Sequence, residues 1–429
     1  MSRRLAAHPA SVGEGRRFIR EALVGSRDEH LSEAAELLVS EVVTNALVHA
    51  GTEVELVARL ERPGVRVEVS DGSPHVPATK HYSSLTATGR GMHLLEQLVD
   101  RWGVESHDHG KTVWFELGTR ERAAPGPDLA PDPAGSGVDR SPASFAVELL
   151  NVPLLLHAAW QMQAESLLRE HLLSQLGEDN GTDQIERHAA ASEALALLSE
   201  QVPAPTLEDA PDVLMATAVE PRVSAEMVRL TVPRASVPHF RLLHEILSAA
   251  TRMADAGALL TPPSQPELQA LRRWLCTEVQ RQTDGGRPGP WVGDVDDAAP
   301  PRLAAEWDSS MVAGATAAML AADDTNRILA VSPAALALLG YDDASELVPR
   351  RLVAIIPPRY RQAHLAGFTL HLFAGRSPLL TAPVTVPALR RDGSEVMVDL
   401  TVSAHHLARG RRVFIASLTA SDAVFPDSA

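Results

Sequence analysis

Three polar side chains at four-residue spacing lie on one predicted helix. Glu41, Asn45 and His49 occupy positions i, i+4 and i+8, so they share one face of that helix. A carboxylate, an amide oxygen and an imidazole on one face can hold a water molecule and a hydrated Mg²⁺ against phosphate groups. Taken alone, this spacing also fits a solvated polar stripe, because short motifs arise by chance.

A further carboxylate stands at the end of a predicted strand. Asp71 follows an alternating apolar run and precedes Gly72, Ser73 and Pro74, which indicate a turn at the end of a sheet. A buried carboxylate there can accept a hydrogen bond from the exocyclic amine of adenine, whereas O6 of guanine cannot donate one. An ordinary Asp-Gly turn is the alternative reading of the same residues.

Two glycines precede another predicted helix, in the order Gly89, Arg90, Gly91 and Met92. Glycines let backbone N–H groups approach a phosphate, and the start of a helix adds partial positive charge. No βαβ unit precedes these residues, so they form neither a dinucleotide-binding fingerprint nor a P-loop. They are a candidate phosphate-binding loop of another kind.

The elements that must position these residues mix helices and strands. Apolar spacing predicts helices over 10–24, 31–49 and 91–101. Alternating residues predict two hairpins, one from 54–61 and 65–71 and one from 103–107 and 112–118. The expected domain is a layer of helices on an antiparallel or mixed sheet.

Taken together over residues 10–118, these motifs resemble the GHKL ATPase superfamily, which includes histidine kinases, Hsp90, gyrase and the anti-sigma-factor serine kinases. Glu41 and Asn45 match its N box, Asp71 its first glycine box, and Gly89 with Gly91 its second. Gly110-Lys111-Thr112, before the strand VWFEL, is similar to its closing Gly/Thr element. The resemblance implies a GHKL (Bergerat) α/β sandwich that binds ATP with Mg²⁺.

The segment LLVSEVVTNALVHAG and the short stretch from Asp71 to Gly89 are similar to anti-sigma-factor kinases. This resemblance implies transfer of the ATP γ-phosphate to a serine of a STAS-type antagonist protein, together with binding of a sigma factor. It makes Glu41 the general base, Asn45 the Mg²⁺ ligand and Asp71 the adenine reader. The implied nucleotide-binding set is Asn45, His49, Asp71, Ser73, Gly89, Arg90, Gly91, Met92, Lys111 and Thr112.

Two alternatives to kinase turnover stay open. Ser73 stands where those families have the glycine of Asp-x-Gly, so a Cβ and a hydroxyl lie where the backbone passes closest to the base. This departure favours a nucleotide-gated protein that binds a partner without phosphorylating it. A divergent histidine kinase would need a phosphoacceptor, for which the pair His244-Glu245 is the nearest match.

Composition divides the rest of the chain. Residues 121–143 and 284–304 are rich in Pro, Gly, Ala and Asp and are predicted linkers. The segment between them, 144–283, shows helical apolar spacing, and Pro153 is expected to kink or start its first helix. The predicted organisation is a GHKL ATPase domain at 1–120, an all-α connector at 144–283, a PAS domain at 305–420 and a tail at 421–429, which makes a multidomain α+β protein.

The last segment resembles a PAS domain, a small-ligand or partner-binding sensor with an α+β fold. The likeness rests on Asn326-Arg-Ile-Leu-Ala-Val-Ser-Pro-Ala-Ala-Leu-Ala-Leu-Leu-Gly-Tyr341 and on Arg390-Arg-Asp-Gly-Ser-Glu395. His364 lies where haem-binding PAS sensors place their axial ligand, so it is a candidate ligand residue. A small apolar ligand, or none, is the alternative.

Composition and charge limit the remaining classes of function. The chain has 429 residues, 45% of them hydrophobic and 22% charged, which is typical of a soluble globular protein. No basic stripe is present, and residues 121–300 carry most of the net charge of −16, which disfavours direct binding of nucleic acid. One cysteine, Cys276, excludes an internal disulfide. No apolar run is long enough for a membrane span, so we expect a cytoplasmic protein, with homodimerisation left open.

Overall fold

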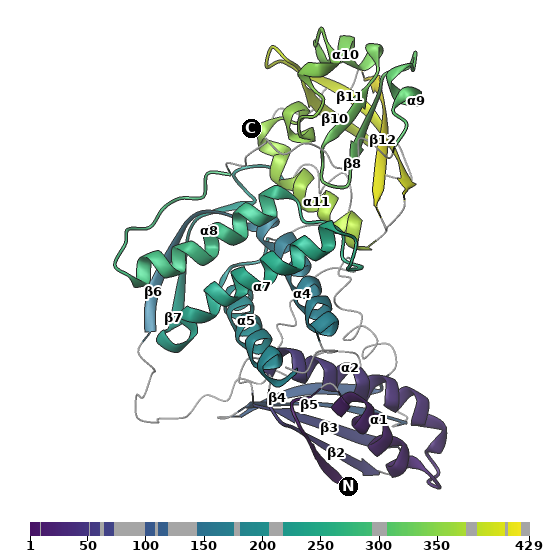
Figure 1. Cartoon of the computed structure of the whole chain (residues 1–429), viewed down its shortest axis with the longest axis vertical. Helices are drawn as coiled ribbons and strands as arrows, with labels where there is room; N and C mark the ends of the chain where they lie inside the picture. Colours follow the sequence, from purple (N-terminus) through teal and green to yellow (C-terminus); the bar gives the residue numbers. More distant parts are fainter. Residues whose placement is uncertain are drawn as a thin grey trace.

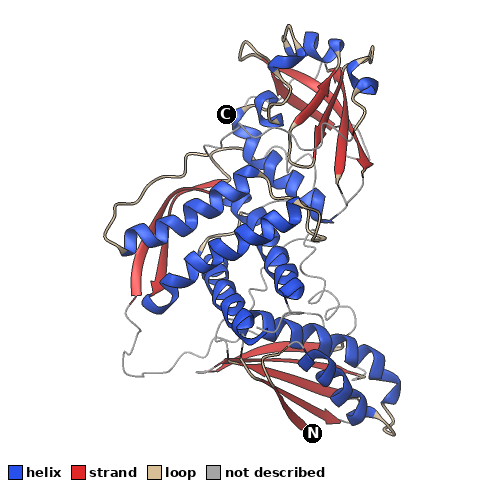
Figure 2. Ribbon diagram, viewed as in Figure 1, coloured by secondary structure: helices blue, strands red, loops and turns tan. Residues whose placement is uncertain are grey.

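The computed structural model describes residues 1–8, 10–50, 52–60, 64–72, 99–107, 110–118, 144–175, 181–205, 218–293, 307–374, 384–407 and 411–421. These residues form a multidomain α+β chain in three parts that follow one another along its long axis (Figure 1). A helix-covered sheet lies at the N-terminal end, a mainly helical region in the middle, and a second sheet at the C-terminal end (Figure 2).

The N-terminal part is a sheet covered on one face by two helices (Figure 1). Its described strands are β1 (Ser2–Leu5), β2 (Val54–Leu60), β3 (Val65–Asp71), β4 (Arg101–His107) and β5 (Gly110–Leu117), paired antiparallel in the order β1-β2-β3-β5-β4. The covering helices are α1 (Ala10–Leu23) and α2 (Ser32–Ala50), with the 3₁₀ turn η1 (Glu29–Leu31) between them. Both hairpins and the first two helices confirm the expectation from sequence. The helix predicted over 91–101 lies almost entirely outside the described residues.

Strand alternation decides which side chains of β3 reach the helices. Val65, Val67 and Val69 are buried beneath α1 and α2, and Asp71 continues the same alternation. The residues between them face the other side of the sheet. The apolar face of β3 therefore ends in a carboxylate on the helix-covered side.

The middle region is mainly helical, as predicted. Its described elements are β6 (Ser144–Pro153), α4 (Leu154–Gln175), α5 (Gly181–Gln201), β7 (Ser224–Pro233), η3 (Arg234–Ser236), α7 (Val237–Asp255) and α8 (Pro266–Thr283). The difference from an all-α region is the antiparallel pair β6–β7. The stretch from Ala146 has helical apolar spacing, but Val147 and Leu149 alternate into the core as a strand because β7 pairs with it. The helix α4 begins directly after Pro153.

The predicted linker at 284–304 begins with residues that contact the middle region. The backbone N–H of Trp291 donates to the carbonyl of Leu150 at 2.9 Å, and the Trp291 and Trp274 rings lie 5.7 Å apart. Residues 284–293 therefore lie against the connector.

The C-terminal part has the α+β organisation that its resemblance to a PAS domain implies. Its described elements are α9 (Ser310–Ala313), β8 (Met319–Asp323), β9 (Ile328–Val331), α10 (Pro333–Leu339), η4 (Ala344–Glu346), η5 (Leu352–Ile355), η6 (Pro358–Tyr360), α11 (Arg361–Ala374), β10 (Val384–Leu389), β11 (Glu395–His406) and β12 (Arg412–Ala420). The strands pair antiparallel in the order β10-β11-β12-β8-β9. Asp392 and Gly393 turn β10 into β11, and Gly393 has the positive φ of 85° that favours glycine there.

Candidate functional site

The carboxylate at the end of β3 is paired with a lysine on the neighbouring strand. The antiparallel register places Lys111 opposite Asp71, and Lys111 Nζ lies 3.2 Å from Asp71 Oδ1. The two side chains are 4% and 1% exposed, respectively, so the pair is withdrawn from water. A buried pair of this kind keeps both charges only while each partner compensates the other.

Gly72 and Gly110 lie where the start of β5 packs closely against the backbone at the end of β3. A Cβ on Gly110 would lie 1.9 Å from the Asp71 carbonyl oxygen, so only glycine fits there. The N–H of Gly72 donates to Thr52 Oγ1 at 2.9 Å, which fixes the turn after the strand. The Gly110-Lys111-Thr112 motif thus has a physical reason: its glycine lets β5 start against the end of β3.

Thr112 lies on the opposite face of the sheet from Asp71. Its Oγ1 is 2.8 Å from Ser70 Oγ and 3.1 Å from His107 Nε2. The structure therefore brings Lys111 to Asp71 and does not bring Thr112 there. A contact between Thr112 and nucleotide stays a prediction.

The helix α2 carries the other predicted residues of this site. Val42, Val43, Ala46 and Leu47 bury one side of α2 in the core, and Asn45 is half-buried at its edge. An amide oxygen is a ligand of the kind that Mg²⁺ prefers, and the role of Asn45 as Mg²⁺ ligand stays a prediction. Glu41 and His49 lie on the same helix, and their side chains are outside the described structure.

Five predicted nucleotide-binding residues lie outside the described structure altogether. They are Ser73, Gly89, Arg90, Gly91 and Met92. Their roles stay predictions from the resemblance.

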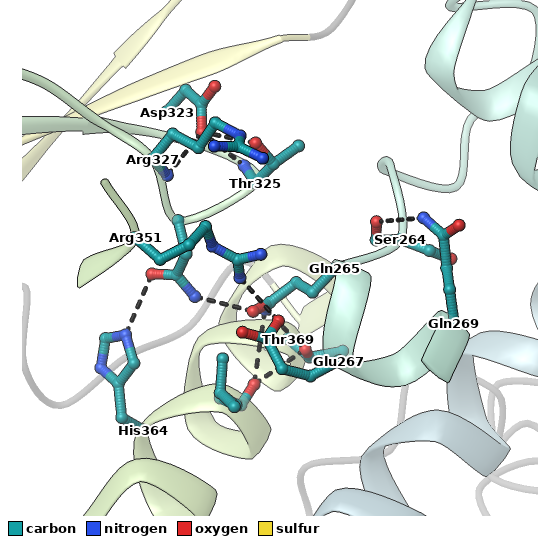
Figure 3. A network of polar contacts seen from close by, with 12 residues as sticks. Ser264, Gln265, Glu267, Gln269, Asp323, Thr325, Arg327, Arg351, His364 and Thr369 are labelled. Atoms are coloured by element: carbon teal, nitrogen blue, oxygen red, sulfur yellow. Dashed lines mark hydrogen bonds and ion pairs between the residues drawn. The ribbon is translucent and has the colours of Figure 1, made fainter. Parts of the chain in front are cut away.

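A second polar centre joins the C-terminal part to the connector (Figure 3). His364 Nε2 on α11 lies 2.9 Å from Asn326 Oδ1, and Asn326 Nδ2 donates to Gln265 Oε1 at 2.7 Å. Gln265 Nε2 in turn donates to Thr369 Oγ1 at 2.8 Å, back on α11. Beside this chain, Arg351 Nη2 lies 2.6 Å from Glu267 Oε2, with both side chains buried. We call these six residues the sensor junction.

His364 is neutral in the sensor junction. An amide oxygen only accepts hydrogen bonds, so His364 donates from Nε2 to Asn326. Burial, with a smaller contribution from the positive charge of Arg351, lowers the pKa of His364 to about 4. The candidate ligand residue thus has one ring nitrogen engaged by Asn326, and a role in ligand binding stays a prediction.

The helix α11 is shared between the sensor part and the connector. Leu365 is buried in the apolar core of the connector, and Ala366 packs with Leu155 of α4. Gln362 Oε1 accepts from the N–H of Leu155 at 2.8 Å, so α11 supplies a partner for the otherwise unsatisfied start of α4. On its other side, the Phe368 ring lies 5.0 Å from that of Phe414 in β12. A shift of α11 must therefore change contacts in both parts.

Sequence reasoning missed most of the sensor junction, although two local signals point to it. Asn326 has a positive φ of 65°, a conformation that asparagine adopts more readily than most residues. Gln265 stands immediately before Pro266 at the start of α8, a usual helix boundary. Neither signal predicts which residues are in contact, because His364 and Gln265 lie 38 and 61 residues away from Asn326 along the chain.

Comparison with known proteins supports the assignment of both end domains. Residues 5–117 match the model of the histidine kinase-like ATPase domain family, and residues 308–419 match that of the PAS fold. The chain thus carries an N-terminal ATPase domain of GHKL type and a C-terminal PAS domain, the organisation of a signalling regulator. The ATPase family implies ATP binding, usually with Mg²⁺.

Individual relatives cover only parts of the chain. An uncharacterized protein of Azorhizobium caulinodans is 36% identical over 99 residues, which are 23% of this chain and 13% of that protein. The PAS domain of an HTR-like protein from Haloarcula marismortui is 22% identical with a TM-score of 0.21, over 26% of this chain and 88% of that one. A domain of a sensory box sensor histidine kinase/response regulator from Geobacter sulfurreducens is 23% identical with a TM-score of 0.20, over 25% and 87%.

A helix that crosses a bilayer must be both long and strongly apolar. Within the described part of the chain, no helix meets both requirements.

Proposed function

We propose that this protein is an ATP-dependent serine kinase that phosphorylates a partner protein under the control of its PAS domain. The observation that carries the proposal is the buried Asp71 at the end of β3, in the same domain as the half-buried Asn45 of α2. These are the two described positions at which the resemblance expects the adenine and the Mg²⁺ of ATP.

In the proposed reaction, Asp71 accepts a hydrogen bond from the adenine amine, and Asn45 holds the Mg²⁺ that accompanies the phosphates. Glu41 takes the proton from the serine hydroxyl of the partner as its oxygen forms a bond to the γ-phosphorus. The bond from that phosphorus to the β–γ bridging oxygen breaks, and ADP leaves. Such a transfer depends mainly on positioning and on neutralising charge. Because Lys111 is held by Asp71, Arg90 is the better candidate for neutralising the phosphates.

The proposed partners are a STAS-type antagonist that carries the phosphorylated serine and a sigma factor bound by the ATPase domain. The PAS domain would act on the connector through α11, whose Leu365 lies in the connector core and whose Phe368 ring packs against Phe414 of β12. A signal that favours one position of α11 shifts the population of two states of the chain.

Experiment can distinguish two other functions from that of a serine kinase. Ser73 favours a nucleotide-gated partner-binding protein without turnover. A histidine kinase would have to use His244, which is partly exposed on α7 with its Nδ1 atom buried.

The test is phosphotransfer from γ-labelled MgATP by the full chain in native cell extract, with Asn45→Ala as the control. A serine kinase gives acid-stable label on a second protein, and Asn45→Ala abolishes it. Glu41→Gln should lose transfer and keep ATP binding. Acid-labile label on the protein itself would support the histidine kinase, and ATP binding without any label would support the nucleotide-gated binder.

A further inference from the structure

The core of the connector contains a guanidinium whose two hydrogen-bond partners in the described structure are uncharged. Arg272 lies in the second turn of α8 and is 6% exposed. Its Nη2 donates to Ser248 Oγ at 3.0 Å and its Nη1 to Thr251 Oγ1 at 3.4 Å, both on α7. Its Nε is buried and has no hydrogen-bond partner within the described structure. Arginine is almost never this buried unless an anion pairs with it.

Among the described residues, no acidic side chain acts on the charge of Arg272. The hydroxyls of Ser248 and Thr251 donate their own protons to helix carbonyls at 2.6 and 2.7 Å, so they act on Arg272 only as neutral acceptors. The charged groups that act on Arg272 are Arg273 and Arg252, which are also positive. Burial raises the pKa of the Cys276 thiol to about 12, so it too is neutral.

The guanidinium nevertheless keeps its charge at neutral pH. Burial, with smaller contributions from the positive charges of Arg273 and Arg252, lowers the pKa of Arg272 only to about 10. A positive charge therefore remains in an apolar core, where an unpaired ion is strongly disfavoured. An anion from outside the chain would stabilise this buried positive charge.

A small cavity adjoins Arg272. Its volume is about 10 Å³, close to the space that one water molecule needs. Trp160 and Leu247 contribute apolar walls, and Gln163, Ser264 and Gln269 contribute polar ones. One amide N–H of Gln163 donates to the carbonyl of Pro262, and one of Gln269 donates to the carbonyl of Ser264. Arg272 is thus the charged donor at a cavity of monatomic size.

We propose that the connector binds one monovalent anion of chloride size at Arg272, in the cavity between α4, α7 and α8. This site is independent of the proposed kinase function, because none of its residues belongs to the ATPase domain. It lies next to the sensor junction: Ser264, which lines the cavity, directly precedes Gln265 (Figure 3). The anion therefore stabilises the start of α8, from which Gln265 and Glu267 reach the PAS domain.

Thermal unfolding of the full chain in sodium chloride and in sodium gluconate, at constant ionic strength, tests the site. Gluconate is far too large for the cavity. We expect chloride to raise the unfolding midpoint by about 2–4 °C in a saturable manner. Arg272→Met should abolish the difference between the two salts. The matched control is Arg273→Met, which removes the same charge from the neighbouring exposed position and should keep the difference.

Equal midpoints in the two salts, or a chloride effect that survives Arg272→Met, would overturn the proposal. If Arg272→Met does not fold, crystals of the unaltered chain grown with sodium bromide decide the matter. Anomalous signal from bromide in the cavity supports the anion site, and a water molecule or an empty cavity there refutes it.

Discussion

The ATPase domain and the sensor junction each contain a buried ion pair. The first pair joins two strands of one sheet, whereas the second joins two parts of the chain. Lys111 and Asp71 lie on adjacent strands of one sheet, so the register of β3 and β5 alone brings them together. Arg351 and Glu267 are 84 residues apart and belong to different parts of the chain, so the docking of those parts brings them together. The first pair prepares a site within one domain, whereas the second makes the position of one domain depend on another.

The largest effect is expected from breaking the pair between the two parts. Glu267→Ala leaves the buried Arg351 without its carboxylate, which should cost about 3–5 kcal/mol of unfolding free energy. Urea unfolding of the full chain measures the loss, and faster protease cleavage between connector and PAS domain should accompany it. Glu226→Ala, at an exposed position of β7, is the control and should change little. A loss below about 1 kcal/mol would show that the junction does not depend on this pair.

A second, pH-dependent effect should arise from His364. Its pKa is about 4 in the folded chain against an ordinary 6.5, so the unfolded chain binds a proton more readily. The neutral His364 therefore contributes about 3 kcal/mol to the free energy of unfolding above pH 6.5. This contribution is lost as the pH falls toward 4. Stability measured from pH 7.5 to 4.5 should decline less steeply in His364→Gln, which keeps a donor for Asn326. The exposed His406→Gln should retain the full slope; equal slopes for both variants would contradict the assignment.

The smallest effects are expected from substitutions on the two faces of the ATPase sheet, measured as changes in ATP affinity. Lys111→Met leaves the Asp71 carboxylate buried without its partner, and ATP affinity should fall by about 10–100-fold, equivalent to about 1.5–3 kcal/mol. Thr112→Ala changes the next residue, on the opposite face; if the nucleotide binds on the helix-covered face alone, it should change affinity less than about twofold. Titration with a fluorescent ATP analogue measures both. Equal losses would mean that the nucleotide does not use the helix-covered face alone.

Local patterns in the sequence predict much of this fold. Helices α1 and α2 and the β2–β3 hairpin follow from apolar periodicity, which depends only on neighbouring residues. The strand β6 does not follow from it, because its conformation depends on pairing with β7, about 70 residues further on.

The same limit applies to the site. Asp71 could be predicted at the end of a strand, since alternation places it on the buried face. Its pairing with Lys111 could not, because that contact depends on the register of two strands, and the two residues are 40 positions apart in the sequence. The residues of the sensor junction carry no motif of their own, and their importance arises only from how the connector and PAS domain meet.

The shared helix α11 means that the unit of descent and the unit of folding differ in this protein. The PAS family match begins at residue 308 and includes α11, yet Leu365 of that helix completes the apolar core of the connector. A fragment cut at the family boundary would expose Leu365 and Ala366 to water, and the connector left behind would have a gap in its core. Exchange of this PAS domain for another, by recombination or by design, therefore succeeds only if the incoming helix reproduces that apolar face.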